Sequence, residues 1–170
     1  MKPLTHIARQ GLNTLDQVGL WIGLLSLRLL LAWEFGEAGF EKLHGSNWFA
    51  DIQYQFPWPF KLVPADINWA LATGLEIVGA MALFIGLGTR FFSASLIVLT
   101  VVAMLSVHWP ESWSTLAELL QGYALTDKGH GNFKLPVMYI AMLLPLVFMG
   151  PGRLSVDAWL CRWRCSDRFN

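Results

Sequence analysis

Long apolar segments alternate with polar segments along this chain of 170 residues. The apolar segments cover about residues 20–42, 68–87, 91–109 and 132–149. A helix needs about 20 mostly apolar residues to cross the hydrocarbon core of a bilayer, and each segment is close to that length. The pattern therefore predicts an all-α fold, an integral membrane four-helix bundle that forms one membrane domain over residues 1–170.

The segments outside these spans have amphipathic or aromatic patterns. Apolar residues recur at helical spacing among polar and basic ones in residues 1–19, in residues 110–131 and in the tail after Gly152. This spacing predicts amphipathic helices on the membrane surface, at both termini and in an outer loop. Residues 43–67 are rich in Trp, Phe and Tyr, which are enriched at the head-group level. We expect this segment to fold onto the membrane, where it could roof a cavity.

The composition agrees with a membrane protein, since 55% of the residues are hydrophobic and only 14% are charged. Soluble domains carry about 25% charged residues. The formal net charge is zero and there is no run of Lys or Arg, so the sequence has no electrostatic signature of nucleic-acid binding. The lipid bilayer is the partner that this composition predicts.

The basic residues other than Arg28 are distributed unequally between the two sides of the membrane. Four spans place both termini and the turn at residues 86–90 on the same side. Cytoplasmic segments carry an excess of Lys and Arg, so we predict that both termini lie in the cytoplasm. The predicted cytoplasmic side carries Lys2, Arg9, Arg90, Arg153, Arg162, Arg164 and Arg168, and the outer side carries Lys42, Lys61, Lys128 and Lys134.

The spans contain a polar cluster of one arginine and four glutamates. An ionised side chain at the centre of a span costs roughly 2.5–3.5 kcal/mol on insertion scales and needs a partner or a wet cavity. Glu34, Glu37 and Glu41 fall within a sector about 60° wide on one helix face, and Arg28 points almost the opposite way. Two interpretations of Arg28 and Glu76 stay open: a buried ion pair that sets the helix register, or a polar cavity with a proton path leading outward.

Three histidines and one methionine are candidate metal ligands at the outer face. His44, His108 and His130 fall on that side, and Met104 precedes His108 by four residues. Imidazole with thioether suits copper(I). The chain has no HxxxH, HExxH or CxxC spacing, so such a site would have to be assembled from different helices. The simpler interpretation, interfacial histidines and a methionine that packs in the bundle, is the stronger one.

Several short motifs occur in an order that resembles the DoxX family of small four-span bacterial membrane proteins. Together they cover roughly residues 20–160. The motifs are LRL at 27–29, GFEKL at 39–43, EIVGA at 76–80, GLGTR at 86–90, His108 at the end of the third span, and GPGRLSVD at 150–157.

The resemblance implies two functions. Some members of the family are membrane subunits of a thiosulfate:quinone oxidoreductase. The aromatic outer loop and the long 110–131 insert are more similar to the HvfX-type branch, which is associated with the maturation of copper-binding modified peptides. We therefore expect an inner-membrane accessory protein that handles such a peptide or its maturation proteins, with copper or quinone as the candidate ligand.

Two alternatives are a quinone-linked oxidoreductase subunit and a small transporter or scaffold. Four spans are few for a transporter, so a homo-oligomer is a further candidate assembly. The sequence contains no cofactor motif and does not decide whether the protein is an enzyme.

Overall fold

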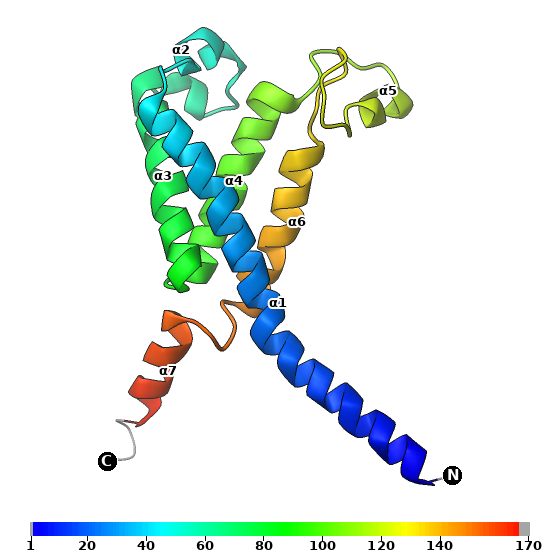
Figure 1. Cartoon of the computed structure of the whole chain (residues 1–170). Helices are drawn as coiled ribbons and strands as arrows, with labels where there is room; N and C mark the ends of the chain where they lie inside the picture. The colour runs from blue at the N-terminus through cyan, green and yellow to red at the C-terminus, as the bar shows by residue number, and fades with distance from the viewer. Residues whose placement is uncertain (1, 167–170) are drawn as a thin grey trace.

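The computed structural model of the chain describes the backbone of residues 2–166 and the side chains of residues 9–163 except 10, 17 and 20. Within these residues the chain is helical and has no strand, which confirms the predicted all-α class (Figure 1). The elements in chain order are α1 (Lys2–His44), α2 (Phe49–Ile52), the 3-10 turns η1 (Gln53–Gln55) and η2 (Phe60–Leu62), α3 (Ala65–Ile85), α4 (Thr89–Ala103), the π-helical turn η3 (Met104–His108), α5 (Leu116–Gln121), α6 (Lys134–Met149) and α7 (Val156–Ser166).

Four helical segments run side by side as a bundle: the C-terminal half of α1, α3, α4 with η3, and α6 (Figure 1). The segments that contain α2 and α5 lie at one end, called the loop end below. The α3–α4 turn, α7 and the start of α1 lie at the other, called the terminal end. The buried core between the helices is aliphatic and aromatic, and it includes Leu24, Leu31, Phe35, Leu83, Leu96, Leu143 and Leu146.

Three of the described helices are long and apolar enough to cross a membrane: α1 from Gly11 to His44, α3, and α4 continued by η3. They correspond to the first three predicted spans. The fourth, α6, has 16 residues and is about 24 Å long, against a hydrocarbon core of about 30 Å. The segment predicted at 132–149 is therefore an apolar helix packed in the bundle, and its crossing of the membrane stays a prediction.

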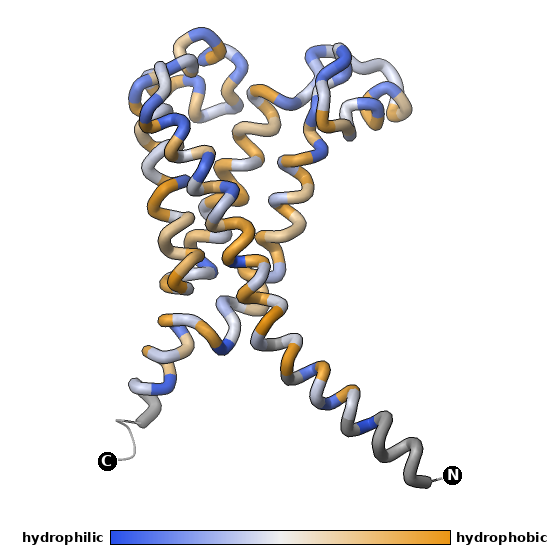
Figure 2. Tube along the Cα trace, viewed as in Figure 1, coloured by the Kyte–Doolittle hydropathy of each residue, from blue (hydrophilic) through white to orange (hydrophobic). Residues whose placement is uncertain are grey.

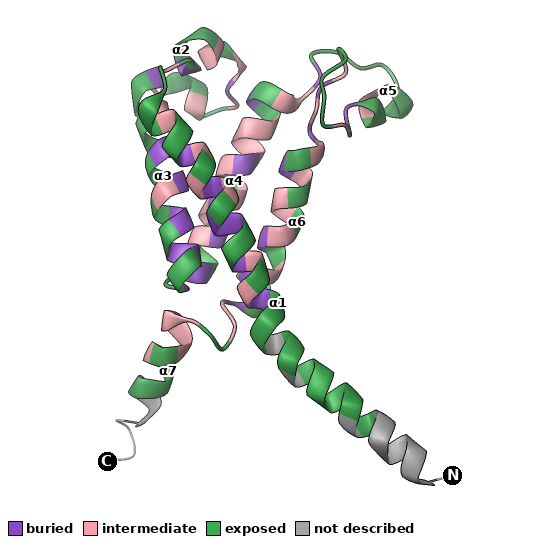
Figure 3. Ribbon diagram, viewed as in Figure 1, coloured by how far each residue is buried: buried purple, intermediate pink, exposed green. Residues whose placement is uncertain are grey.

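The prediction of a separate surface helix at residues 1–19 is wrong. α1 is one helix of 43 residues, about 64 Å long, and its N-terminal half projects away from the bundle (Figure 1). That half alternates hydrophilic and hydrophobic positions (Figure 2), and its described side chains are exposed (Figure 3). The helix continues because no proline follows Pro3 until Pro57, and Gly11 and Gly19 alone do not end it.

The predicted surface helix in the outer loop is much shorter than its pattern suggested. α5 contains only six residues, and Thr115 and Glu118 form a capping box at its start. Trp113 lies before the N-cap of this helix. Tyr123 lies beyond its end, because the segment turns at Gly122 and again at Gly129, whose φ is 88°. The tail does form a helix, α7, while the side chains from Arg164 onward lie outside the described residues.

Candidate functional site

Small residues bring α1 and α3 into close contact near the loop end. A Cβ atom added at Gly39 would lie 3.0 Å from the Cβ of Glu76 and 2.8 Å from Cγ1 of Ile77. One added at Gly36 would lie 3.6 Å from the Cβ of Ala80. Small residues at such positions let the backbones of membrane helices approach each other. The contact places Lys42, three residues after Gly39, beside Glu76.

Lys42 and Glu76 form an ion pair across this contact, in which Glu76 is buried and Lys42 half-buried. The Nζ atom of Lys42 donates to both carboxylate oxygens of Glu76 at 2.9 Å, and also to the carbonyl oxygen of Ala38 at 3.5 Å. Glu76 is only 7% exposed. A carboxylate buried among apolar helices needs a cation or hydrogen-bond donors, and Lys42 provides both.

Arg28 is not the partner of Glu76, which corrects the ion-pair interpretation of these two residues. Among the described residues, Arg28 makes no salt bridge and is 1% exposed. It lies fourteen residues before Lys42 on α1, about 21 Å along the helix axis. Its guanidinium donates to four backbone carbonyls, those of Leu83 at 2.8 Å, Phe84 at 3.0 Å, Pro151 at 2.9 Å and Leu154 at 2.7 Å.

These carbonyls explain why a charged side chain is stable there. The last carbonyls of a helix have no partner within the helix and carry the negative end of its dipole. Leu83 and Phe84 lie in the last turn of α3, and Arg28 also joins that turn to the segment after α6. Gly86 makes room for the guanidinium, because a Cβ atom there would lie 2.6 Å from its Nη2 atom.

A cavity of about 700 Å³ lies beside the Lys42–Glu76 pair, between α3 and α4 at the loop end. This volume falls within the range of about 300–1,000 Å³ that is usual for sites of small molecules. Leu71, Val98 and Val107 line it and are themselves exposed on the outer surface of the helices. The cavity is therefore open to the surface of the bundle beside these apolar residues. Gly74 also lines it, and a Cβ atom there would meet no atom within 4 Å.

The aromatic loop covers this cavity, as its composition suggested. Trp48, Phe49, Phe56 and Phe60 all line the cavity. The ring of Phe49 packs edge-on against Trp48, Phe56 and Trp69, with centroids 4.9, 5.1 and 5.0 Å away. Edge-to-face pairs at these distances are favourable.

Asn68 fixes this cover to α3. Its Nδ2 atom donates to the carbonyl oxygens of Phe60 at 2.8 Å and Val63 at 3.2 Å. Asn68 itself is buried and lines the cavity. The cover is therefore joined to the helix by hydrogen bonds as well as by ring packing.

His108 lines the cavity from the end of the π-helical turn η3. Its Nδ1 atom lies 2.8 Å from Oδ1 of Asn132, and the Asn132 N–H donates to the His108 carbonyl at 2.9 Å. With the amide oxygen as acceptor, the proton lies on Nδ1 and Nε2 is left as an acceptor. π-Helical turns occur frequently at functional sites, and this one ends at the cavity.

The three glutamates of the acidic stripe are not part of this cavity. Glu34 accepts a hydrogen bond of 2.5 Å from the hydroxyl of Tyr139, which joins α1 to α6. Glu37 and Glu41 are exposed on the surface of α1. The predicted polar cluster is thus divided into Arg28 at the terminal end, Glu76 at the cavity, and the stripe on another face of α1. A proton path along the stripe stays a prediction.

The candidate metal ligands do not form a site together. His44 is exposed and its Nδ1 atom lies 2.9 Å from the carbonyl oxygen of Phe40, while His130 lies in the loop before α6. Of the four candidates, His108 lines the cavity and Met104 does not. Across the described part of the chain, no group of three or more His, Cys, Asp or Glu residues could hold a metal ion. The structure therefore does not bring the candidate ligands together, and the copper site stays a prediction.

Lys42, Asn68 and Asn132 are site residues that sequence reasoning missed. Lys42 belongs to the GFEKL motif, but its position in the sequence indicates only a basic residue at the outer end of a span. The signal for it was the isolated charge of Glu76, which required a cation, together with the close-packing Gly39 one turn before the lysine. The partners of Asn68 and Asn132 depend on loop conformation and have no sequence signal.

Comparisons with known proteins agree with the motif pattern. Residues 23–109 match the DoxX family. The chain is also similar to an uncharacterized protein of Haemophilus influenzae, with 45% identity over 140 residues that cover 82% of this chain and 84% of that protein. No solved structure matches the chain. The matched region contains Lys42, Glu76 and His108 and so includes the polar part of the cavity.

Proposed function

This chain belongs to the DoxX family of membrane proteins, and on that premise we propose that it binds a membrane-soluble quinone in the cavity between α3 and α4. The observation that carries the proposal is an open cavity with exposed apolar residues and an ion pair in its wall. A quinone has the matching chemistry, a polar ring with two carbonyl oxygens and a long apolar tail.

The two parts of the cavity suit the two parts of such a ligand. The tail would lie between α3 and α4 against Leu71, Val98 and Val107, which are already exposed there. The ring would lie under the aromatic loop, where Phe49 and Trp48 offer surfaces for stacking. Most ligand sites combine such an apolar lining with a few polar groups that orient the ligand.

The polar groups of the wall can orient the ring and exchange protons with it. The Lys42 ammonium has three N–H donors and Glu76 takes two hydrogen bonds from it, so a carbonyl oxygen of the ligand can compete for a donor. The free Nε2 atom of His108 can accept a hydrogen bond from the hydroxyl of the reduced form. In this proposal the chain itself binds the quinone and exchanges protons with it. Electron transfer would require a partner subunit, as in a thiosulfate:quinone oxidoreductase.

The test is to measure quinone binding with a matched pair of glycine variants. Gly74→Leu places a side chain in the cavity, and Gly23→Leu places the same side chain on an open face of α1, since a Cβ atom at either position meets nothing within 4 Å. We expect a water-soluble short-chain quinone to bind the purified protein, measured by tryptophan fluorescence quenching. Gly74→Leu should weaken binding at least about tenfold, equivalent to 1.4 kcal/mol, and Gly23→Leu should not change it. No binding, or equal binding by both variants, overturns the proposal and leaves a scaffold or transport role.

The role in maturation of a copper-binding modified peptide is the second candidate. His108 at the cavity is the one observation in its favour. It predicts stoichiometric copper in gently purified protein, lost in His44→Ala, His108→Ala and His130→Ala. Copper content that is unchanged in all three variants rejects a copper site built from these histidines.

The proposed orientation places both termini in the cytoplasm of a bacterium and the cavity near the outer face of its inner membrane. It rests on the unequal distribution of basic residues. A reporter fused after Asn170 should be active in the cytoplasm, and a reporter found outside contradicts this orientation.

A further inference from the structure

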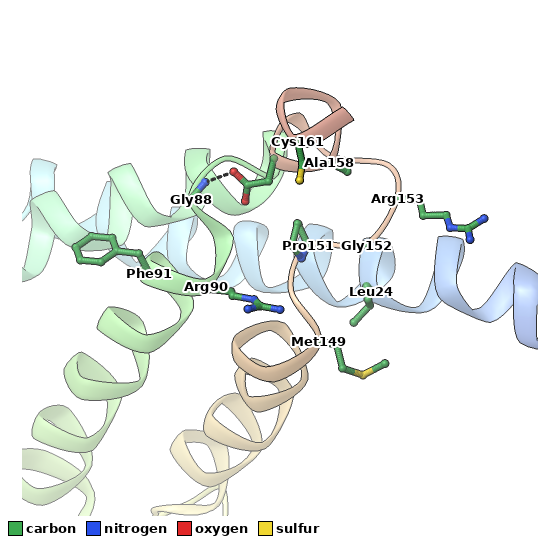
Figure 4. A pocket seen from close by; sticks show the side chains of 11 residues that line it. Leu24, Gly88, Arg90, Phe91, Met149, Pro151, Gly152, Arg153, Ala158 and Cys161 are labelled. Atoms are coloured by element: carbon green, nitrogen blue, oxygen red, sulfur yellow. Dashed lines mark hydrogen bonds between the residues drawn. The ribbon is translucent and has the colours of Figure 1, made fainter. Parts of the chain in front are cut away.

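A second cavity, of about 680 Å³, lies at the terminal end of the bundle. It is formed where the start of α4, the end of α6, α7 and α1 meet (Figure 4). Its apolar lining includes Leu24, Phe91 and Met149, and its basic residues are Arg90 and Arg153. The quinone proposal does not use any of these residues.

The walls of this cavity are held by hydrogen bonds. The carboxylate of Asp157, at the start of α7, accepts from the Gly88 N–H at 2.8 Å (Figure 4). It also accepts from the Thr89 N–H at 3.0 Å. The Asp157 N–H donates to the carbonyl oxygen of Gly86 at 3.0 Å. Arg28 holds the segment before α7 through the carbonyls of Pro151 and Leu154. The acidic residue of the cavity therefore already has partners for both of its oxygens.

Arg90 is a charged side chain with few partners in an unusual position. It lies in the first turn of α4, where the helix dipole disfavours a cation. Among the described residues, the Nη2 atom of Arg90 donates one long hydrogen bond, 3.4 Å to the carbonyl oxygen of Phe148. Arg90 makes no salt bridge with the described acidic residues. A guanidinium has five N–H donors, so most of them remain available to an anion with several oxygens.

The surroundings indicate that this anion is attached to an apolar molecule. Phe91 and Met149 are 69% and 59% exposed on the outside of the bundle beside the cavity. Arg153 lies at the far edge, directed away from Arg90 (Figure 4), and its guanidinium lies 5.7 Å from the ring centroid of Trp21. Tryptophan and arginine are typical of the boundary between hydrocarbon and head groups. Residues of these types are found at the depth of the phosphate groups of a bilayer.

We infer that this cavity binds the phosphate of an anionic phospholipid, with Arg90 as the residue that contacts the phosphate. The acyl chains lie along Phe91 and Met149, and Arg153 is near the outer part of the head group. Basic pockets between membrane helices are known to hold acidic lipid head groups. A free phosphate ion would use Arg90 equally well but would leave the exposed apolar surface without a function.

Cys161 provides a direct probe, because this exposed thiol lines the cavity. The experiment uses the full chain with Cys165→Ser, in detergent, and measures the rate at which a maleimide modifies Cys161. Added phosphatidylglycerol should slow the reaction, and phosphatidylcholine with the same acyl chains should not. Arg90→Gln should raise the phosphatidylglycerol concentration needed for protection roughly tenfold, the effect of one lost charge-assisted phosphate contact.

Arg9→Gln is the matched control, since it removes the same charge from an exposed position on the projecting half of α1. It should leave protection unchanged. Equal protection by both lipids, or unchanged protection in Arg90→Gln, overturns the inference. Protection by inorganic phosphate alone at millimolar concentration would assign the site to a soluble phosphate compound instead. If Arg90→Gln does not fold, the comparison of phosphatidylglycerol with phosphatidylcholine on the chain that keeps Arg90 still tests whether the cavity binds an anionic lipid.

Discussion

Arg28 and Lys42 are a buried and a half-buried cation on the same helix, and their surroundings differ in kind. Arg28 is held by four backbone carbonyls from two segments and has almost no exposed surface. Lys42 is held chiefly by one carboxylate, and both members of that pair line a cavity that reaches the surface of the bundle.

The difference separates a structural cation from one that is available for function. A guanidinium whose donors are used by the backbone has little to offer a ligand, because binding would require breaking bonds that hold the fold together. An ion pair at a cavity wall can exchange one partner for a ligand at a lower cost. Charge in a membrane span is therefore not by itself evidence of a functional site.

Arg28→Leu is expected to have the largest effect on stability. The change removes four charge-assisted hydrogen bonds and leaves buried carbonyls without donors, each at a cost of about 1–3 kcal/mol. We expect the free energy of unfolding to fall by at least about 4 kcal/mol, measured by denaturant titration in detergent micelles. Arg28→Lys should recover only part of this, because an ammonium group lacks the planar fork. A loss below about 1 kcal/mol for Arg28→Leu would contradict the structural role.

The Lys42–Glu76 pair should show a smaller effect and a strong coupling. Lys42→Met leaves the buried Glu76 without its cation, and we expect it to cost about 3 kcal/mol. Glu76→Gln leaves the half-buried ammonium group of Lys42 without its carboxylate and should cost less. The double variant should cost less than the sum, with a coupling energy of roughly 0.5–3 kcal/mol.

A double-mutant cycle between Arg28 and Glu76 is the control, because these two residues form no hydrogen bond or salt bridge with each other. Arg28→Leu and Glu76→Gln should add within about 0.5 kcal/mol. Coupling there, together with additivity between Lys42 and Glu76, would reverse the assignment of partners.

The fold class followed from the hydropathy pattern, but the partners of the charged residues did not. The pattern of α3 places Glu76 in a span and requires a cation for it, and two candidates were available on α1. The choice between them depends on the register of α1 against α3. That register is set by the contacts of Gly39 with Ile77 and of Gly36 with Ala80, which cannot be read from either helix alone.

The errors at the ends of the chain have a related cause. Amphipathic spacing in residues 1–19 correctly indicated a helix, but spacing does not say whether that helix is separate from the next one or continuous with it.

The partners of Arg28 were also beyond prediction. The sequence indicates a buried charge at Arg28, yet its acceptors are backbone carbonyls 55 or more residues away. Every residue type has a backbone carbonyl, so the sequence does not identify such an acceptor. The partner expected for Arg28 from the sequence was therefore an acidic side chain.

The hydrogen bond between Tyr139 and Glu34 extends the comparison to a third polar contact of α1, with the smallest expected effect. It is short, 2.5 Å, but both side chains are only half-buried and each helix has other contacts in the bundle core. Tyr139→Phe keeps the ring that packs against Phe35 at 5.6 Å and removes only the hydroxyl. We expect a loss of about 0.6 kcal/mol, typical of hydrogen bonds between membrane helices, measured by the same unfolding assay. A loss as large as that of Arg28→Leu would mean that the α1–α6 contact, and with it the acidic stripe, holds the bundle together as firmly as the terminal end does.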